Sequence, residues 1–371
     1  MELLAAAATF QLCLHLHHQV GHVIRALSFL ASSIIYAAVL VHPRRHAWFR
    51  IFHRSGSEKI HRSAVAVAGR VATDRVTDAF AKVVAFAPNG RSGYAAGAAA
   101  SEDELDPIGL ADRAAAKACA PGPEVVLAPG TYTTVWEPHA TRELLWVLGE
   151  SAFDGLAYTE GRGALSGALG RRVAAAGVNV ADSPRHPATL PRAFDAEGVT
   201  KGALPLIQDG VAAGVVHHRR SAALAGVRST GHALSPGDAD GPRTTNLVMA
   251  GGGARDEAEL CAGVERGIYV TRLWYTNVLR ERDATFTAVT RDGTFLIEDG
   301  RITRPVADMR ITEGALDVLG RVQALGARTV LAGDGEFYGP RFAQGIVCPA
   351  LRAHHVRFTG SARDGAQGAA D

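Results

Sequence analysis

The sequence predicts an α+β protein in which a reduced N-terminal α/β domain precedes a larger, antiparallel β-rich C-terminal domain. Three observations support this prediction. The chain has 371 residues, which is enough for two hydrophobic cores. Strand and turn signals are densest between Gly263 and Val306. Single helix start signals alternate with strand-like segments before this run, and one more helix start signal follows it.

The run from Gly263 to Val306 is predicted to be an antiparallel meander. Ile268 to Val270 and Thr285 to Val289 are rich in β-branched and aromatic residues. Asp292-Gly293 and Asp299-Gly300 are expected to form tight turns, because glycine accepts the positive φ that such turns require. The segment Arg272 to Asn277, between the first two strands, is interpreted either as a loop that covers the sheet or as a binding loop.

Three helices have clear signals. Asp106-Pro107 is an N-cap followed by a first-turn proline, and this helix is expected to reach about Ala120. Pro138 begins a helix with a broad apolar face. Thr312 is expected to cap a third helix whose apolar stripe extends to Leu325, with Gly326 as its end.

Further strands are predicted on either side of two hairpin turns and near the end of the chain. Asn89-Gly90 and Asp209-Gly210 are expected to be hairpin turns. Ser229 to Pro242 is expected to be a loop. Ile346 to Cys348 and Val356 to Phe358 are predicted as two separate closing strands.

Composition excludes several classes of protein. Hydrophobic residues make up 47% and charged residues 20% of the chain, as in globular proteins rather than disordered ones. A net charge of +2, with no basic patch among aromatics, argues against direct nucleic-acid binding. The four cysteines form no C-x-x-C pair, so no disulfide framework is expected.

The first 62 residues have an unusual composition. They hold eight of the 15 histidines, but no carboxylate accompanies the pair His18 and His22, so a metal site is not predicted there. Ala26 to Val41 is a nearly continuous apolar run that is shorter than the ~20 residues of a membrane-spanning helix. A buried or surface-lying helix is one interpretation of this run, and the sequence alone leaves membrane contact open.

Common catalytic motifs are absent from the sequence. No histidine is followed by glutamate, and there is neither a G-x-S-x-G nor a G-x-x-x-x-G-K-[ST] motif. A Ser/His/Asp set remains possible, because the members of such a set need not be neighbours in sequence. Catalytic residues are therefore left unassigned.

Several short runs resemble the TldD/PmbA family, whose members are described as metallopeptidase-related and, historically, as modulators of DNA gyrase. The resemblance extends from about Arg91 to about Gly360, and its specificity comes from the order and spacing of the runs. The matching runs are Gly263 to Thr271, Tyr275 to Asn277, Asp292 to Gly300, Phe194 to Val199, Ser229 to His232, Thr245 to Leu247, Pro349 to Leu351, and Arg357 to Gly360.

The resemblance implies one of two family arms. TldD-type subunits resemble zinc peptidases with an H-E-x-x-x-H motif on a helix, and PmbA (TldE) subunits lack that motif and pair with them. Here Trp146 to Ser151 stands where the motif would fall, without a histidine. The implied assignment is the PmbA/TldE arm, with no metal or other cofactor in this chain and zinc in the partner. Whether this chain is itself an enzyme stays uncertain.

The resemblance also implies a division of the chain. Residues 1–62 are an atypical His-rich and apolar segment, and 63–123 are a remnant of the N-terminal TldD/PmbA domain, which is longer in the family. Residues 124–360 are the C-terminal TldD/PmbA domain, and 361–371 are a flexible tail. Whether 1–62 are genuine, or reflect a start-site or frameshift artefact, is left open.

The expected function is that of a zinc-free subunit in a cytoplasmic, hetero-oligomeric peptidase that degrades or trims peptides. Its expected partners are a TldD-type metallopeptidase subunit and a peptide or unfolded polypeptide. Candidate residues of a substrate groove are Thr230, His232, Asn246, Trp274, Tyr275 and Asn277. One alternative is a stand-alone hydrolase with an unrecognised metal or nucleophile site. Another is a degenerate product without function, against which cooperative unfolding would argue.

Overall fold

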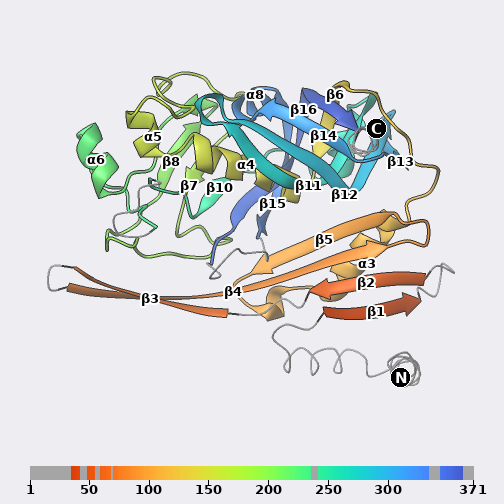
Figure 1. Ribbon diagram of the computed structural model, residues 1–371, viewed down its shortest axis with the longest axis horizontal. Helices are drawn as coiled ribbons and strands as arrows, with labels where there is room; N and C mark the ends of the chain where they lie inside the picture. Colours follow the sequence, from red (N-terminus) through yellow and green to blue (C-terminus); the bar gives the residue numbers. More distant parts are fainter. Residues whose placement is uncertain are drawn as a thin grey trace, which may run out of the picture.

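The computed structural model describes residues 35–41, 48–54, 59–67, 70–234, 241–333 and 343–361. Within these residues the chain forms two sheets, one of five strands and one of 11 (Figure 1). The smaller sheet is N-terminal and carries one long helix, and the larger sheet holds most of the helices. The predicted α+β class, with a smaller N-terminal unit and a larger β-rich C-terminal unit, is confirmed.

The smaller sheet has the strand order β1-β2-β4-β3, with β5 on the other edge of β4. Helix α3 packs on it through Leu110 and Ala114, and Gly93 makes this close approach possible. A Cβ at Gly93 would lie 2.1 Å from the Ala114 carbonyl oxygen. The elements are β1 (Ile35–Val41), β2 (Trp48–Arg54), β3 (Lys59–Val67), β4 (Arg70–Phe86), β5 (Ser92–Ala99), η1 (Glu102–Glu104) and α3 (Pro107–Ala118).

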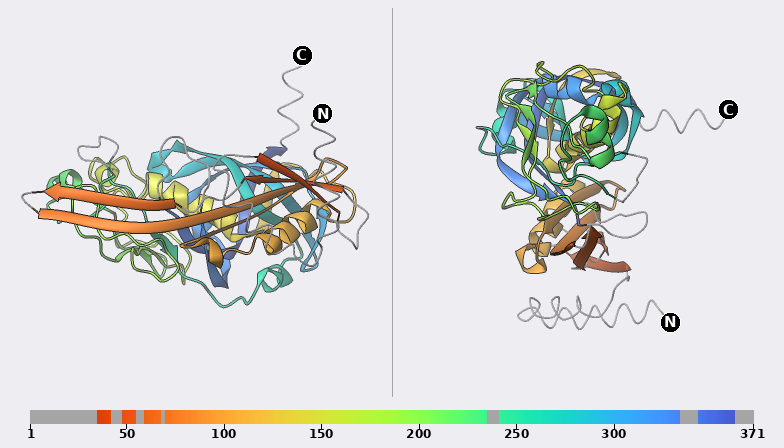
Figure 2. Two further views of the ribbon diagram at one scale, coloured as in Figure 1. Left: turned by 90° about the horizontal axis from the view of Figure 1, so that it is seen from below. Right: turned by 90° about the vertical axis from the view of Figure 1, so that its left-hand side faces the viewer.

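The β3–β4 hairpin reaches beyond the rest of the smaller sheet and lies along the larger unit (Figure 2). Asp74 on β4 accepts a hydrogen bond from the Ala193 backbone N–H at 2.8 Å. Val76 packs against a small core cluster that includes Leu190 and Val347. The two units therefore share apolar as well as polar contacts.

The larger sheet curves until it meets itself. Its order is β13-β12-β11-β6-β16-β10-β7-β8-β9, and β14 pairs with both β12 and β16. Strands β12, β11, β6, β16 and β14 thus form a closed ring. The strands are β6 (Gly130–Trp136), β7 (Val180–Asp182), β8 (Leu204–Gln208), β9 (Val211–Ala212), β10 (Leu247–Met249), β11 (Arg266–Arg280), β12 (Thr285–Glu298), β13 (Arg301–Pro305), β14 (Met309–Gly314), β15 (Val322–Ala332) and β16 (Ile346–Ser361).

Helix α4 lies in the core of the larger unit. Leu144, Leu145 and Leu148 are fully buried in the same cluster as side chains from β6, β11, β12, β14 and β16. Burying a leucine stabilises a fold by about 1.5–3 kcal/mol, so this face anchors the helix. The helices and short helical turns are α4 (Pro138–Ser151), α5 (Gly155–Thr159), α6 (Arg219–Ala225), α7 (Glu257–Ala262), η2 (Glu281–Asp283) and α8 (Ala315–Gly320).

The predicted turn at Asp292-Gly293 is wrong. These residues form a bulge within the continuous strand β12, because Val270 pairs with Thr294 while Arg272 pairs with Arg291. Asp292 has φ 56° and Gly293 has φ 130°, so both adopt the left-handed backbone that the pattern indicated. The turn at Asp299-Gly300 is confirmed as the β12–β13 hairpin.

The predicted loop between Arg272 and Asn277 is also wrong, because this segment belongs to β11. The irregularity that the aromatic and amide residues indicated is a second bulge, between Trp274 and Asn277, with Tyr275 at φ 56°. The bulge leaves Tyr275 exposed while the strand continues to Arg280.

Two other predictions need correction near the end of the chain. The helix expected from Thr312 to Leu325 is the short α8, since Thr312 lies in β14 and Leu325 lies in β15, paired with Leu351. The two predicted closing strands are one strand, β16, which is continuous from Ile346 to Ser361.

Several predicted elements are confirmed. Asp106 caps α3, Pro138 begins α4, and the hairpins at Asn89-Gly90 and Asp209-Gly210 form as predicted. Strand β1 shows that the described part of the Ala26–Val41 run is extended and not helical. The His18–His22 cluster and residues 362–371 lie outside the described residues. No helix among the described residues is long and apolar enough to cross a membrane.

Candidate functional site: the pocket beside helix α4

A pocket of the larger unit opens beside the C-terminal half of α4. It has a volume of about 410 Å³. Gly149 allows the opposite wall to approach the helix, because a Cβ at this position would lie 2.6 Å from Thr244 Oγ1. The lining residues are Arg142, Trp146, Gly149 and Glu150 of α4, Leu234, the segment Arg243 to Thr245, Leu247, and Gln344 to Ile346.

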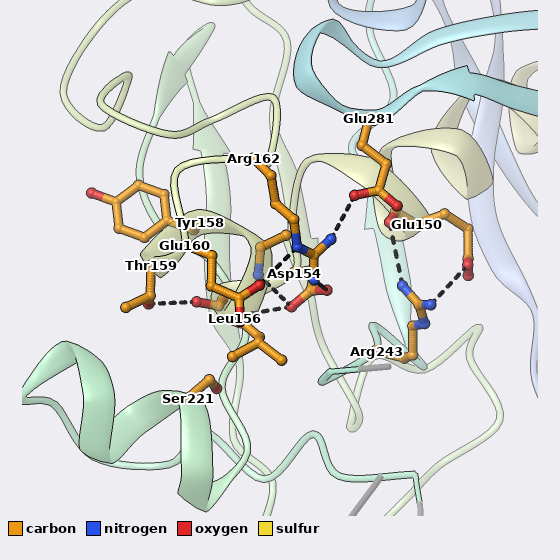
Figure 3. A network of polar contacts seen from close by, with 12 residues as sticks. Glu150, Asp154, Leu156, Tyr158, Thr159, Glu160, Arg162, Ser221, Arg243 and Glu281 are labelled. Carbon is orange, nitrogen blue, oxygen red and sulfur yellow. Dashed lines mark hydrogen bonds and ion pairs between the residues drawn. The ribbon is translucent and has the colours of Figure 1, made fainter. Parts of the chain in front are cut away.

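Charged side chains are paired across this pocket. Arg243 places Nη2 3.4 Å from Glu150 Oε2 and donates from Nη1 to the Glu150 carbonyl oxygen at 3.3 Å (Figure 3). Arg142 forms an ion pair with Glu143. Trp146 supplies an apolar surface between these groups, being only partly buried against the core. The pocket can therefore contact both apolar and charged parts of a ligand.

A second polar network lies next to the Arg243–Glu150 pair. Arg162 bridges Glu160 at 2.8 Å and Glu281 at 2.5 Å, and lies 3.9 Å from Asp154 (Figure 3). Asp154 is buried, and its Oδ1 accepts the backbone N–H of Leu156 at 2.7 Å. Burial raises the pKa of Asp154 above its ordinary value. This network joins the end of α4, helix α5 and the turn after β11.

Behind the pocket wall lies a cluster of fully buried charges. Asp182 Oδ1 lies 3.3 Å from Lys201 Nζ and 3.1 Å from His232 Nε2, and none of the three side chains is exposed. Asp182 Oδ2 accepts the backbone N–H groups of Thr245 and Asn246, each at 2.9 Å. Since Thr245 lines the pocket, the buried carboxylate fixes part of the pocket wall.

The ionisation of this cluster follows from burial and pairing. Burial alone would raise the pKa of Asp182, but His232 and Lys201 hold it well below its usual range. Burial lowers the pKa of Lys201 to about 8, against the attraction of Asp182. Burial also lowers the pKa of His232. At neutral pH the cluster therefore holds a carboxylate, an ammonium and an uncharged imidazole.

Histidines and hydroxyls continue the cluster toward α6. Ser221 Oγ lies 3.1 Å from His217 Nδ1 and 2.8 Å from His218 Nδ1. His218 is also the N-cap of α6, since its side chain accepts the Ser221 backbone N–H. Gly155 allows the His217 ring to approach the backbone, because a Cβ there would lie 2.4 Å from His217 Nδ1. These imidazoles are engaged in packing and capping.

The predicted groove residues fall into two separate groups. Thr230, His232 and Asn246 meet in the buried cluster, where Thr230 Oγ1 lies 2.8 Å from His232 Nδ1 and Asn246 Nδ2 donates to the Leu190 carbonyl at 2.7 Å. His232 and Asn246 are each 1% exposed, so they support the wall behind the pocket rather than line it.

The other three lie on the second bulge of β11 and are not among the residues that line the pocket. The guanidinium groups of Arg272 and Arg291 both lie over the Trp274 ring, with central carbons 4.8 Å and 5.3 Å from its centroid. Tyr275 is 75% exposed, and Asn277 Nδ2 donates to the Tyr275 carbonyl at 2.8 Å. The sequence reasoning missed Asp182, Lys201 and the pair Arg243–Glu150, because no motif links these distant positions.

A separate cavity of about 350 Å³ lies between the two sheets. Ser92 donates to Asp292 at 2.5 Å, and Arg272 forms an ion pair with the same carboxylate while stacking on the Tyr94 ring at 4.3 Å. Asp308 also lines this cavity, and burial together with the Asp292 charge raises its pKa to about 7. Polar contacts therefore hold the smaller sheet against β11 and β12.

The residues at α4 do not fit a zinc site of the kind that the family resemblance implies for TldD-type subunits. A zinc helix needs imidazole or thiolate ligands one turn apart, and Trp146 to Ser151 offers Glu150 alone. In the part of the chain that the structure describes, no group of three or more His, Cys, Asp and Glu side chains could hold a metal ion.

Comparison with known proteins agrees with this architecture. The family described as the PmbA/TldA metallopeptidase C-terminal domain matches residues 129–360. A metalloprotease of Methanothermobacter thermautotrophicus is 28% identical over 201 residues, which are 53% of this chain and 43% of that protein. A metalloprotease TldD homolog of Haemophilus influenzae is 29% identical over 176 residues, which are 45% of this chain and 35% of that protein. The matches thus span less than half of the length of these relatives.

Solved structures show the same fold. TldE from Thermococcus kodakarensis superposes with a TM-score of 0.69 at 19% identity, covering 85% of this chain and 69% of that one. A putative modulator of DNA gyrase from Thermotoga maritima superposes with a TM-score of 0.70 at 21% identity, covering 84% of this chain and 69% of that one.

The family match, on a chain whose sheet closes round a buried helix, places the chain in a class of metallopeptidase-related α+β proteins. Within that class, the chain belongs to the PmbA/TldD family, because the family domain matches more than half of its length.

Proposed function

We propose that this chain is the zinc-free, PmbA/TldE-like subunit of a hetero-oligomeric peptidase, whose TldD-type partner carries the metal. The observation that carries the proposal is the face that α4 presents to the pocket. Trp146, Gly149 and Glu150 stand there instead of metal-binding imidazoles. The pocket has a volume of about 410 Å³, which suits a binding role.

The chemistry of the pocket favours a peptide or an unfolded polypeptide as its ligand. Trp146 can pack on an apolar side chain, and the Arg243–Glu150 pair can exchange its hydrogen bonds for those of a peptide backbone. Tyr275 is a second candidate contact, because it is exposed on the β11 bulge. The proposed location is the cytoplasm, which suits the free thiols of Cys119, Cys261 and Cys348.

The proposal is tested by measuring zinc content and peptidase activity on an unfolded polypeptide, for this chain alone and mixed with a TldD-type partner. We expect the chain alone to be free of zinc and inactive, and activity to appear with the partner. Stoichiometric zinc together with cleavage by the chain alone would overturn the proposal.

A matched pair of glycine variants tests the role of the pocket. Gly149→Ala places a methyl group against Thr244 Oγ1, and we expect it to weaken polypeptide binding in the mixed complex at least fivefold. Gly320→Ala is the control, because no atom lies within 4 Å of its Cβ position. Equal binding by both variants would show that the pocket does not hold the polypeptide.

One observation favours a second function, a hydrolase that acts alone. Asp182, His232 and Thr230 follow one another in the order acid, imidazole, hydroxyl. Thr230 Oγ1, however, already accepts the His217 backbone N–H at 2.7 Å, and the imidazole is buried. Hydrolysis by the chain alone that is lost in Thr230→Val and retained in Ser229→Ala would support this second function.

A further inference from the structure

We infer that His232 is the positioning residue of the α4 pocket, and that the pocket wall is assembled only while this imidazole is uncharged. The inference rests on the proposed function for what the pocket binds, but its geometric part concerns this chain alone. It assigns to His232 the role of joining the buried cluster to the pocket.

Three contacts of His232 place it between the cluster and the pocket. Its Nε2 lies 3.1 Å from Asp182 Oδ1, and its Nδ1 lies 2.8 Å from Thr230 Oγ1. Its carbonyl oxygen accepts the backbone N–H of Arg243 at 3.0 Å. Arg243 in turn reaches across the pocket to Glu150 on α4. Movement of His232 therefore moves the residue that pairs with α4.

The same contacts suit a neutral ring. The unprotonated Nδ1 can accept from the Thr230 hydroxyl, and Nε2 lies 3.1 Å from Asp182 Oδ1 without completing a hydrogen bond to it. A second proton would place a positive charge beside Lys201, which lies 3.3 Å from the same carboxylate oxygen. Two cations would then share one buried carboxylate, and water is excluded from all three side chains.

The other charged groups near His232 do not relieve this conflict. Arg192 is a further, partly buried cation whose charge interacts with Asp182, and desolvation lowers the pKa of Arg192 to about 10. His217 is a neighbouring imidazole whose pKa burial also lowers. Asp195 is engaged with the Ala233 backbone N–H at 2.9 Å, as well as with those of Glu197 and Val199. Glu150 and Arg243, on the pocket side, already pair with each other.

The consequence is a pocket that loses its wall in acid. A protonated His232 is accommodated only if the ring moves away from Lys201, and the segment Ser229 to Leu234 then moves with it. Leu234 lines the pocket, and the backbone N–H of Arg243 donates to the His232 carbonyl. The parts of the wall formed by Leu234 and by Arg243 therefore move together. Polypeptide binding to the pocket should then weaken at pH values below the ordinary pKa of histidine.

Trp146 reports this change without any partner or substrate, because its indole lines the pocket. We propose to follow the indole N–H signals of the full chain by ¹H–¹⁵N spectroscopy between pH 4.5 and pH 8, with Trp146→Phe as the assignment. The expected result is one transition of the Trp146 signal with a midpoint below pH 6.5. The transition should be absent in His232→Asn and unchanged in His355→Asn, whose ring is exposed and whose φ of 50° suits asparagine.

An unchanged Trp146 transition in His232→Asn would overturn the inference and assign the change to Glu150 or His217. If His232→Asn does not unfold cooperatively, the wild-type chain still decides. The ring signals of His232 are followed in the same samples. The midpoint of the Trp146 transition must coincide with the midpoint of the His232 ring, and a mismatch rejects the inference. The readout needs no TldD-type subunit, so its failure is distinct from failure of the proposed peptidase role.

Discussion

The cluster at Asp182 and the contact between the two sheets both hold aspartates beside other charged groups, with opposite results for their ionisation. At Asp182, one carboxylate is balanced by Lys201 and by two backbone N–H groups within 3.3 Å. Between the sheets, Asp292 is balanced by Arg272, but Asp308 faces the like charges of Asp292 and Glu124. A buried carboxylate is thus kept ionised where its partners are fixed, and is pushed toward its neutral form where they are not.

The largest effect is expected at Asp182. Asp182→Ala leaves Lys201 as a buried cation without its partner and removes the acceptor of two backbone N–H groups. We expect the free energy of unfolding to fall by about 3–5 kcal/mol, measured by urea denaturation. The control is Glu259→Ala, which breaks an exposed ion pair with Arg255 and should leave the free energy of unfolding nearly unchanged. Equal losses for the two variants would contradict the comparison.

A smaller loss is expected at the contact between the sheets. Asp292→Asn weakens the ion pair with Arg272 and the hydrogen bond from Ser92, while asparagine keeps the left-handed backbone at φ 56°. We expect a loss of about 2 kcal/mol in the free energy of unfolding. Asp299→Asn, at φ 48° in an exposed hairpin turn, should change it by less than about 0.5 kcal/mol.

A substitution at Asp308 should stabilise the chain, in contrast to the substitutions at Asp182 and Asp292. Its folded pKa of about 7 lies above the ordinary value of 3.8, so the folded state binds the proton more tightly, and stability falls as pH rises from about 4 to about 7. Asp308→Asn should therefore stabilise the chain by about 1–2 kcal/mol at pH 8, allowing for partial exposure, and by almost nothing at pH 4. A gain that is the same at both pH values would reject this assignment; thermal unfolding at the two pH values measures it.

The smallest effect is expected at Tyr275, away from both charge clusters. This residue is 75% exposed yet has φ 56°, a conformation that asparagine adopts more readily than an aromatic residue. Tyr275→Asn should raise the free energy of unfolding by about 0.5 kcal/mol. If Tyr275 contacts the polypeptide, the same variant should weaken binding in the mixed complex. A destabilised variant would show that the tyrosine ring is packed.

Local signals in the sequence predicted elements whose partners are close by in the chain. Asp299-Gly300 makes the predicted hairpin, since Glu298 and Arg301 pair directly on either side of it. Asp292-Gly293 has the same dipeptide, but β11 pairs with β12 on both sides of it and converts the turn into a bulge. Helix α8 stops at Gly320 because Val322 and Leu325 pair with β16, a partner that the i, i+3 spacing cannot reveal.

Only part of the candidate site could be predicted from the sequence. Pro138 and the apolar face that follows it predicted α4, and the resemblance indicated that the zinc motif of TldD-type subunits would fall on this helix, at Trp146 to Ser151. His232 and Asn246 were singled out as groove residues, yet their environment depends on Asp182 and Lys201, which come from other parts of the chain. Charge pairing across a fold has no local pattern, because any carboxylate and any cation can form it.

Strand β16 has a consequence for how the chain is made. It pairs with β6, β10, β14 and β15, and it joins Phe358 to Gly130, about 230 residues earlier. During synthesis, β6 and β10 therefore emerge from the ribosome long before the strand that lies between them. Such distant pairings slow folding and leave strand edges open to aggregation. We expect the nascent larger unit to remain incomplete, and to be a substrate for chaperones, until its last strand has been synthesised.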